Sequence, residues 1–136
     1  MADATGSVQH RGGCLCGAVR YEVHGPLRPI IACHCSQCRR QTGHFMAATA
    51  ARLGDFVLAK EAGLRWYRSS PKARRGFCTT CGSTMFWQGE GSDHISIAAG
   101  TVDGKTGLAI TRHIFTADKG DYYAITDAVP QSEQWD

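Results

Sequence analysis

The chain is organised around Ile30-Ile31-Ala32-Cys33-His34-Cys35-Ser36-Gln37-Cys38, which places three cysteines within six positions directly after an apolar run. So dense a group of thiols is hard to explain by packing. As metal ligands, the three thiols would come from one local turn of the chain and would leave one position of a tetrahedral site open. The stretch therefore predicts a metal site with room for an exchangeable ligand.

Four further cysteines form two short pairs. Cys14 and Cys16 are flanked by glycine, and residues two apart in an extended strand point to the same face. The segment Cys78-Thr79-Thr80-Cys81-Gly82 has the form of a zinc knuckle, in which a tight turn aims both thiolates at one point and the glycine accepts a positive φ. The seven thiols divide most simply into a closed group of four and an open group of three. Spacing alone also permits Cys33 and Cys35 to combine with the knuckle.

Length and composition indicate a single globular domain. The chain has 136 residues, enough to bury a substantial core, and its seven cysteines cannot all pair as disulfides. We see no secretory signal and no apolar run near the ~20 residues of a membrane span, so we expect a cytoplasmic protein with reduced thiols and no membrane partner. The formal charge of +3 is too small to indicate nucleic-acid binding.

Short alternating segments predict a mainly β fold. Residues 36–41 should form one or two helical turns that stop at Gly43. We expect a flexible N-terminus over residues 1–11, one domain over residues 12–127 and a polar tail over residues 128–136 that is loose from Gln131 onward. The expected strands are 19–24, 30–33, 45–51, 56–60, 64–69, 84–87, 95–98, 113–115 and 122–125.

Three motifs together resemble those of the glutathione-dependent formaldehyde-activating family, also called the centromere protein V type. They are Gly13–Tyr21, Cys33–Arg39 and Phe77–Ser83, and the resemblance runs from about Gly12 to about Asp127 with all seven cysteines in register. It implies a β-tent-like fold, mainly β, of short antiparallel sheets stacked around zinc with at most short helical turns. It also implies two zinc ions per chain. The implied ligands are Cys14, Cys16, Cys78 and Cys81 for a structural zinc, and Cys33, Cys35 and Cys38 for a catalytic zinc.

The resemblance implies a zinc-dependent carbon-sulfur lyase that acts on S-(hydroxymethyl)glutathione or a related adduct of a small thiol and an aldehyde. The thiol, such as glutathione, would bind at the three-cysteine zinc, since soft ligands suit another sulfur. The founding members are longer than this chain, so part of their pocket need not be present. An alternative is a zinc-ordered binding or carrier module without catalysis, and the absence of an eighth cysteine favours the enzyme. We also allow for a homodimer.

Glutathione has two carboxylates, so its pocket should contain basic groups. Arg39 and Arg40 directly follow the three cysteines, and Lys72, Arg74 and Arg75 precede the knuckle. These side chains either bind carboxylates or form a solvated face.

Two histidines and four aromatic residues complete the set of candidates. His44 is a candidate fourth ligand or proton acceptor, or else an ordinary surface or core histidine. His34 should point away from the thiols on either side of it, which indicates a structural or hydrogen-bonding role. The aromatic residues most simply pack the core, although one beside the zinc would exclude water; they are Phe45, Trp66, Phe77 and Trp87.

Overall fold

The computed structural model describes residues 6–135, and within them the fold is mainly β, as predicted. One helix, α1 (Ser36–Thr42), and three short 3-10 turns (Leu53–Asp55, Ala99–Thr101 and Thr116–Asp118) accompany the strands. The strands are β1 (His10–Gly13), β2 (Arg20–Val23), β3 (Ile30–Cys33), β4 (Met46–Arg52), β5 (Phe56–Lys60), β6 (Leu64–Ser70), β7 (Ala73–Cys78), β8 (Thr84–Gly89), β9 (His94–Ala98) and β10 (Ile110–Ile114).

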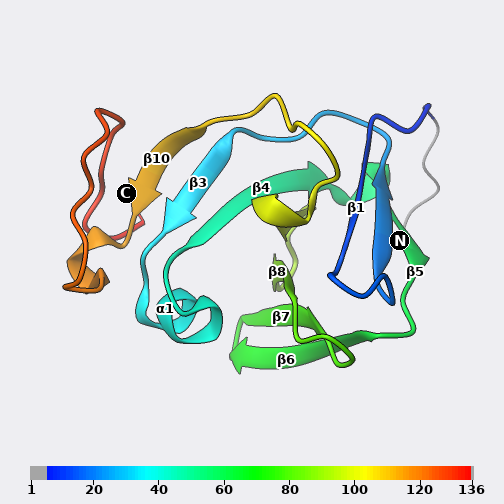
Figure 1. The fold of residues 1–136 in the computed structure, drawn as a ribbon, viewed down its shortest axis with the longest axis horizontal. Helices are drawn as coiled ribbons and strands as arrows, with labels where there is room; N and C mark the ends of the chain where they lie inside the picture. Colours follow the sequence, from blue (N-terminus) through cyan, green and yellow to red (C-terminus); the bar gives the residue numbers. More distant parts are fainter. Residues whose placement is uncertain (1–5, 136) are drawn as a thin grey trace.

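The strands form two sheets. The smaller has the order β1-β2-β5, and the larger has the order β10-β3-β4-β9-β8-β7-β6. Neighbouring strands are antiparallel except for β10 and β3, which are parallel. Figure 1 shows the larger sheet curving so that β3 and β10 lie on one side of α1 and β6 and β7 on the other. This curvature lets side chains from both ends of the sheet meet at α1.

A buried aromatic group joins the two sheets. Tyr21 of β2 lies 5.7 Å, centroid to centroid, from both Phe56 of β5 and Phe86 of β8, and the two phenylalanines are 5.3 Å apart. All three are at most 1% exposed. Cys14 and Cys78 belong to the same buried cluster. The predicted group of four cysteines is therefore continuous with the hydrophobic core.

Helix α1 begins and ends where the sequence indicated. Cys35 is its N-cap, and the Cys35 Sγ accepts a hydrogen bond from the backbone N–H of Cys38. Gly43 ends the helix with φ of 81°, a left-handed conformation that favours glycine. The helix therefore holds two of the three clustered cysteines in a fixed turn.

Four expectations about the elements differ from the structure. Strand β7 was not expected, and residues 122–125 form no strand. The described part of the tail is not loose, because its backbone hydrogen-bonds along the end of β10, including Ser132 N–H to the His113 carbonyl at 2.9 Å. Strand β1 begins at His10, inside the segment expected to be flexible, while residues 1–5 lie outside the described part of the chain.

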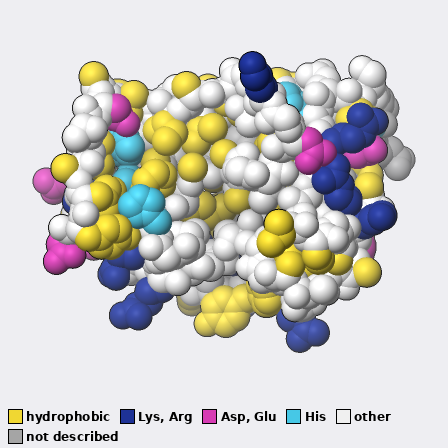
Figure 2. All heavy atoms as spheres, in the orientation of Figure 1, with side chains coloured by type: hydrophobic (Ala, Val, Ile, Leu, Met, Phe, Trp, Pro, Cys, Tyr) yellow, Lys and Arg dark blue, Asp and Glu magenta, His cyan; other side chains and the backbone are white. Residues whose placement is uncertain are grey.

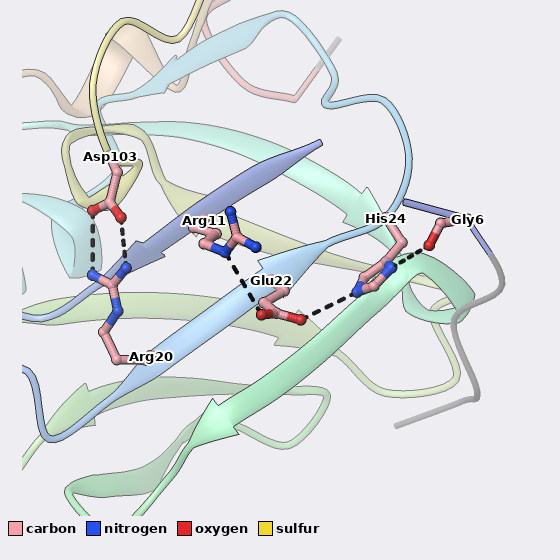
Figure 3. Close-up of polar contacts among 6 residues, drawn as sticks. All are labelled: Gly6, Arg11, Arg20, Glu22, His24 and Asp103. Carbon is pink, nitrogen blue, oxygen red and sulfur yellow. Dashed lines mark hydrogen bonds and ion pairs between the residues drawn. The ribbon is translucent and has the colours of Figure 1, made fainter. Parts of the chain in front are cut away.

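Polar side chains cross the outer surface of the smaller sheet. Figure 3 shows Arg20 paired with Asp103 through two hydrogen bonds of 3.2 and 2.5 Å, and Arg11 beside Glu22 at 3.7 Å. Glu22 also contacts His24 at 3.3 Å. These contacts join β1 to β2, and β2 to the loop after the second 3-10 turn. Residues 6–135 contain no helix with the length and apolar character that a membrane crossing requires.

Candidate metal centres and thiol site

Cys14, Cys16, Cys78 and Cys81 form one cluster, in which all four Sγ atoms lie within 4.8 Å of one another. The first pair lies in the loop between β1 and β2, and the second lies at the end of β7 and in the turn that follows. The Sγ of Cys16 is 3.7 Å from that of Cys14 and 3.8 Å from that of Cys78. A tetrahedral zinc with Zn–S bonds of about 2.3 Å places its sulfur ligands roughly 3.8 Å apart. The donor set and its spacing therefore fit a closed zinc site.

Neighbouring groups hold this cluster together. The Ser83 hydroxyl lies 3.2 Å from the Cys81 Sγ and accepts a hydrogen bond from the Leu15 backbone N–H at 3.0 Å, so it links the two loops. The bond from Ser83 lowers the pKa of Cys81 to about 5. Gly82 has φ of 79°, the positive value expected after a knuckle. A Cβ on Gly63 would lie 2.9 Å from the Cys78 Sγ, so only glycine fits beneath the cluster.

Cys33, Cys35 and Cys38 form the second cluster, again with all Sγ atoms within 4.8 Å of one another. Hydrogen bonds from Cys33 and then Cys38 lower the pKa of Cys35, while the same contact with Cys35 raises the pKa of Cys33. Proximity alone thus favours one thiolate at the expense of its neighbours, and a bound cation would allow all three to ionise. In the described chain no histidine, carboxylate or further cysteine joins this group. It fits a metal with one coordination position left open.

A buried arginine faces the second cluster from β7. Both terminal nitrogens of Arg75 lie 3.5 Å from the Cys38 Sγ, and Nη1 donates to the Gln41 Oε1 at 2.9 Å. Arg75 is only 5% exposed, and its Nε has no hydrogen-bond partner within residues 6–135. Three thiolates around a divalent zinc carry a net formal charge of about −1. The guanidinium would offset that charge, which explains how a cation is tolerated in this position.

A cavity of about 510 Å³ opens onto the same three thiols. Its lining comes from α1, the strands of the larger sheet and the segment after β10, and it has the size of a small-molecule site. Arg28 and Arg75 provide positive charge in its lining. Neither arginine has a carboxylate partner in the described part of the chain. Most of the remaining wall is apolar and includes Ile31, Met46, Ala48, Trp87, Ile114, Phe115 and Trp135.

Comparison with known proteins places the chain in a family. Residues 9–118 match the family model described as glutathione-dependent formaldehyde-activating enzyme. The chain belongs to this family. A Schizosaccharomyces pombe protein named as an uncharacterized lyase is 27% identical over 117 residues, which make up 85% of this chain and 84% of that protein. The crystal structure of a Rhodobacter sphaeroides protein is similar with a TM-score of 0.61 and 27% identity, over 89% of this chain and 98% of that one.

The family and the lyase relative support a glutathione-related lyase or activating enzyme. The structure also brings together the four cysteines and the three cysteines in the division that the resemblance implied. Cys33, Cys35 and Cys38 all line the cavity. Of the five basic residues considered from the sequence, Arg75 lines it as well.

The other predicted substrate residues lie elsewhere. Arg39, Arg40 and His44 do not line the cavity, and Arg40 and His44 are exposed. The His44 Nδ1 lies 3.1 Å from the Tyr122 hydroxyl, as expected of a surface histidine. Arg74 points to the other side of β7, where it stacks on Trp66 at 3.9 Å.

His34 has the hydrogen-bonding role that alternation predicted. It is 1% exposed, and its Nε2 lies 2.9 Å from the His113 Nδ1. The His113 Nε2 in turn lies 3.0 Å from the Asp127 Oδ2, and Tyr123 binds the His34 Nδ1. This chain of side chains connects His34, which lies between Cys33 and Cys35 directly after β3, to β10 and the segment after it. No local sequence signal identified His113, Asp127 or Arg28 as neighbours of the site.

Proposed function

We propose that the protein is a zinc-dependent carbon-sulfur lyase that acts on S-(hydroxymethyl)glutathione or a closely related adduct of a small thiol and an aldehyde. The observation that carries this proposal is the cavity that opens onto Cys33, Cys35 and Cys38. A cluster with a purely structural role would be closed by a fourth protein ligand, as the other cluster is. When bound by the three cysteines, zinc would act as a Lewis acid with affinity for sulfur and would favour the deprotonated form of a thiol.

The cavity residues would bind and orient the substrate. Arg75 and Arg28 lack carboxylate partners and can pair with the two carboxylates of glutathione. The apolar side chains around them, Trp87 among them, would exclude water and strengthen these pairs. In the reaction the carbon-sulfur bond breaks with its electron pair staying on sulfur, and the hydroxyl oxygen gives its proton to solvent as the carbon-oxygen double bond of the aldehyde forms. Arg75 beside Cys38 would stabilise the negative charge that develops there.

All seven cysteines are free thiols. A reducing, cytoplasmic setting would keep them available as ligands. Glutathione is abundant under the same reducing conditions, which supports it as the partner thiol.

The proposal is tested by replacing Cys35 with serine. A serine hydroxyl is a favourable helix N-cap and can still accept from the Cys38 N–H, so Cys35→Ser should melt close to the wild type. It should also lower the metal content from two zinc ions per chain toward one. Formaldehyde–glutathione exchange, followed by NMR, should fall at least about 100-fold, because a ligand of the reactive metal is lost.

Ser36→Ala is the matched control, since Ser36 is the exposed neighbour of Cys35. It should retain both metal content and exchange activity. Full exchange activity in Cys35→Ser, with metal at the wild-type level, would contradict the proposal. An inactive wild type that holds two zinc ions would instead support the binding-module alternative.

A further inference from the structure

The segment after β10, residues 115–135, forms one wall of the cavity. Phe115 at its start and Trp135 at its end both line the space above the three cysteines, next to Ile114 of β10. Ile114 is the register partner of Cys33, so this apolar wall begins beside the thiols. Most of the segment lies beyond residues 9–118, which match the family model. Figure 2 shows hydrophobic and histidine side chains gathered at this end of the molecule, over β10 and the segment after it.

The segment is fixed in place by several independent contacts. The Phe115 N–H donates to the Gln134 carbonyl at 3.0 Å, which joins the two ends of the segment. Asp127, from its middle, binds His113, which binds His34 of the thiol-bearing stretch. Arg112 of β10 donates to the Trp135 carbonyl and lies 5.3 Å from the centre of its ring. The position of the wall is therefore tied to the position of the cysteines.

The conformation of Phe115 also indicates a constrained wall. Its φ of 54° is the positive value that residues with side chains rarely adopt, and it is unique among the described residues other than glycine. Trp135 lines the cavity and is 52% exposed, so part of its surface can meet a ligand there. Two aromatic side chains held in this way can accept an apolar group from the cavity.

The charges of the cavity decide which part of a substrate meets this wall. Arg75 comes from β7, and four other strands separate β7 from β10 in the sheet. Arg28 precedes β3, at the end of that strand opposite Cys33 and its register partner Ile114. The carboxylates and ammonium of glutathione have no partners among Ile114, Phe115 and Trp135, and burying them there would be unfavourable. In the formaldehyde adduct the carbon bound to sulfur bears only hydrogens besides its hydroxyl group, so it would leave the wall unfilled.

We propose that Ile114, Phe115 and Trp135 receive the substituent on the carbon bound to sulfur, so that the preferred substrate is the adduct of a small thiol with an alkyl or aryl aldehyde. This inference rests on the proposed lyase function. The bond changes are those already given: the carbon-sulfur bond breaks with its electron pair on sulfur, the hydroxyl proton passes to solvent, and the aldehyde and thiolate are released without any oxidant or reductant. Phe115 and Trp135 are specificity-determining residues in this scheme.

Binding of stable thioethers tests the wall separately from catalysis. S-hexylglutathione and S-methylglutathione share the tripeptide and differ only in the length of the alkyl group. Calorimetry with the zinc-loaded protein should show at least about tenfold tighter binding of the hexyl compound, as expected for methylene groups that enter an apolar pocket. Trp135→Ala should reduce this ratio several-fold. Phe115→Asn, which suits the left-handed backbone but lacks the ring, should do the same.

Tyr67→Ala is the matched control, because Tyr67 is an aromatic residue of similar exposure, 64%, that does not line the cavity. It should leave the ratio unchanged. Equal binding of the two thioethers, or a ratio unaffected by both wall variants, would overturn the inference.

Turnover of the glutathione adducts of formaldehyde and hexanal completes the test. A wild type that binds the hexyl thioether preferentially but releases neither aldehyde would uphold the wall and contradict the lyase function. A wild type that releases formaldehyde at least as efficiently as hexanal, with no preference between thioethers, would uphold the lyase function and overturn the wall. Preferential release of hexanal, lost in Trp135→Ala, would support both.

Discussion

The two cysteine clusters use the same ligand chemistry in different surroundings. The four-cysteine cluster joins two loops that are more than sixty residues apart, and its buried members Cys14 and Cys78 are part of the core. The three-cysteine cluster comes from one continuous stretch at the end of β3 and the start of α1, and it faces a cavity. The number of thiols, the sequence separation they span and the space beside them decide what each cluster can do. One is suited to hold the fold together, and the other is suited to bind a ligand.

The largest predicted effect is loss of the fold when the closed cluster is broken. A structural zinc contributes on the order of 10 kcal/mol to folding. Cys78 is fully buried, so Cys78→Ser would also leave a hydroxyl in the core. We expect this variant to unfold at room temperature, as measured by circular dichroism and thermal melting.

The comparison with Cys35→Ser makes this prediction decisive. Both variants lose one zinc ligand, yet only Cys78→Ser should lose the fold, because the open cluster closes no long loop. A chelator should first remove the zinc of the open cluster, with little change in ellipticity. Removal of the zinc of the closed cluster should then unfold the protein. Similar melting temperatures for the two variants would show that the clusters do not differ in this way.

Local sequence patterns were sufficient to predict many of the features on which this comparison of the two clusters rests. The glycine after the knuckle, the helical turn after Cys35 and the alternating strands are dictated by residues close to one another in the chain. The mainly β fold and the family could therefore be predicted. Their common feature is that each depends on φ preferences, side-chain alternation or cysteine spacing within a few residues.

The remaining features depend on partners far away in the sequence. Strand β7 contains an alanine and a glycine, which are depleted in strands, and its two adjacent arginines break the alternation of apolar and polar residues. It is a strand because β6 and β8 pair with it on both sides. The curvature of the sheet then brings Arg75 to Cys38. The tail was misjudged for a similar reason, since its polar residues carry no local signal for pairing with β10.

Arg75 provides a second, smaller test of the difference between the clusters. Arg75→Gln removes the charge beside the open cluster and leaves the side-chain Oε1 of Gln41 without its donor, which should lower stability by about 1–3 kcal/mol. Glutathione affinity should fall at least about tenfold, because a charge-assisted pair is lost. Calorimetric titration with glutathione and urea denaturation measure the two effects.

Arg74→Gln is the matched control for this variant. Arg74 precedes Arg75 on β7 but points to the opposite side, where it binds Gln88 and stacks on Trp66. Its replacement should leave glutathione affinity unchanged while the zinc content stays at two. If both variants weaken glutathione binding equally, the effect comes from overall charge and not from the position of Arg75 at the open cluster.

The smallest predicted effect lies at the other end of the molecule, near the closed cluster. Arg20, four residues after Cys16, forms a two-bond pair with Asp103 that lowers the pKa of this carboxyl. A lowered folded-state pKa adds stability above the unfolded value of about 3.9, and this stability is lost as pH falls through the folded value.

Because the pair is largely exposed, Asp103→Asn should reduce the free energy of unfolding at pH 7 by only about 0.5–1 kcal/mol. The difference from wild type should shrink below pH 4, whereas the control Glu90→Gln, at an exposed position, should leave the free energy of unfolding at pH 7 unchanged. Neither substitution should alter glutathione binding, since both residues lie outside the cavity that opens onto Cys33, Cys35 and Cys38. A difference from wild type that persists unchanged to pH 2 would show that Asp103 contributes through packing instead of charge.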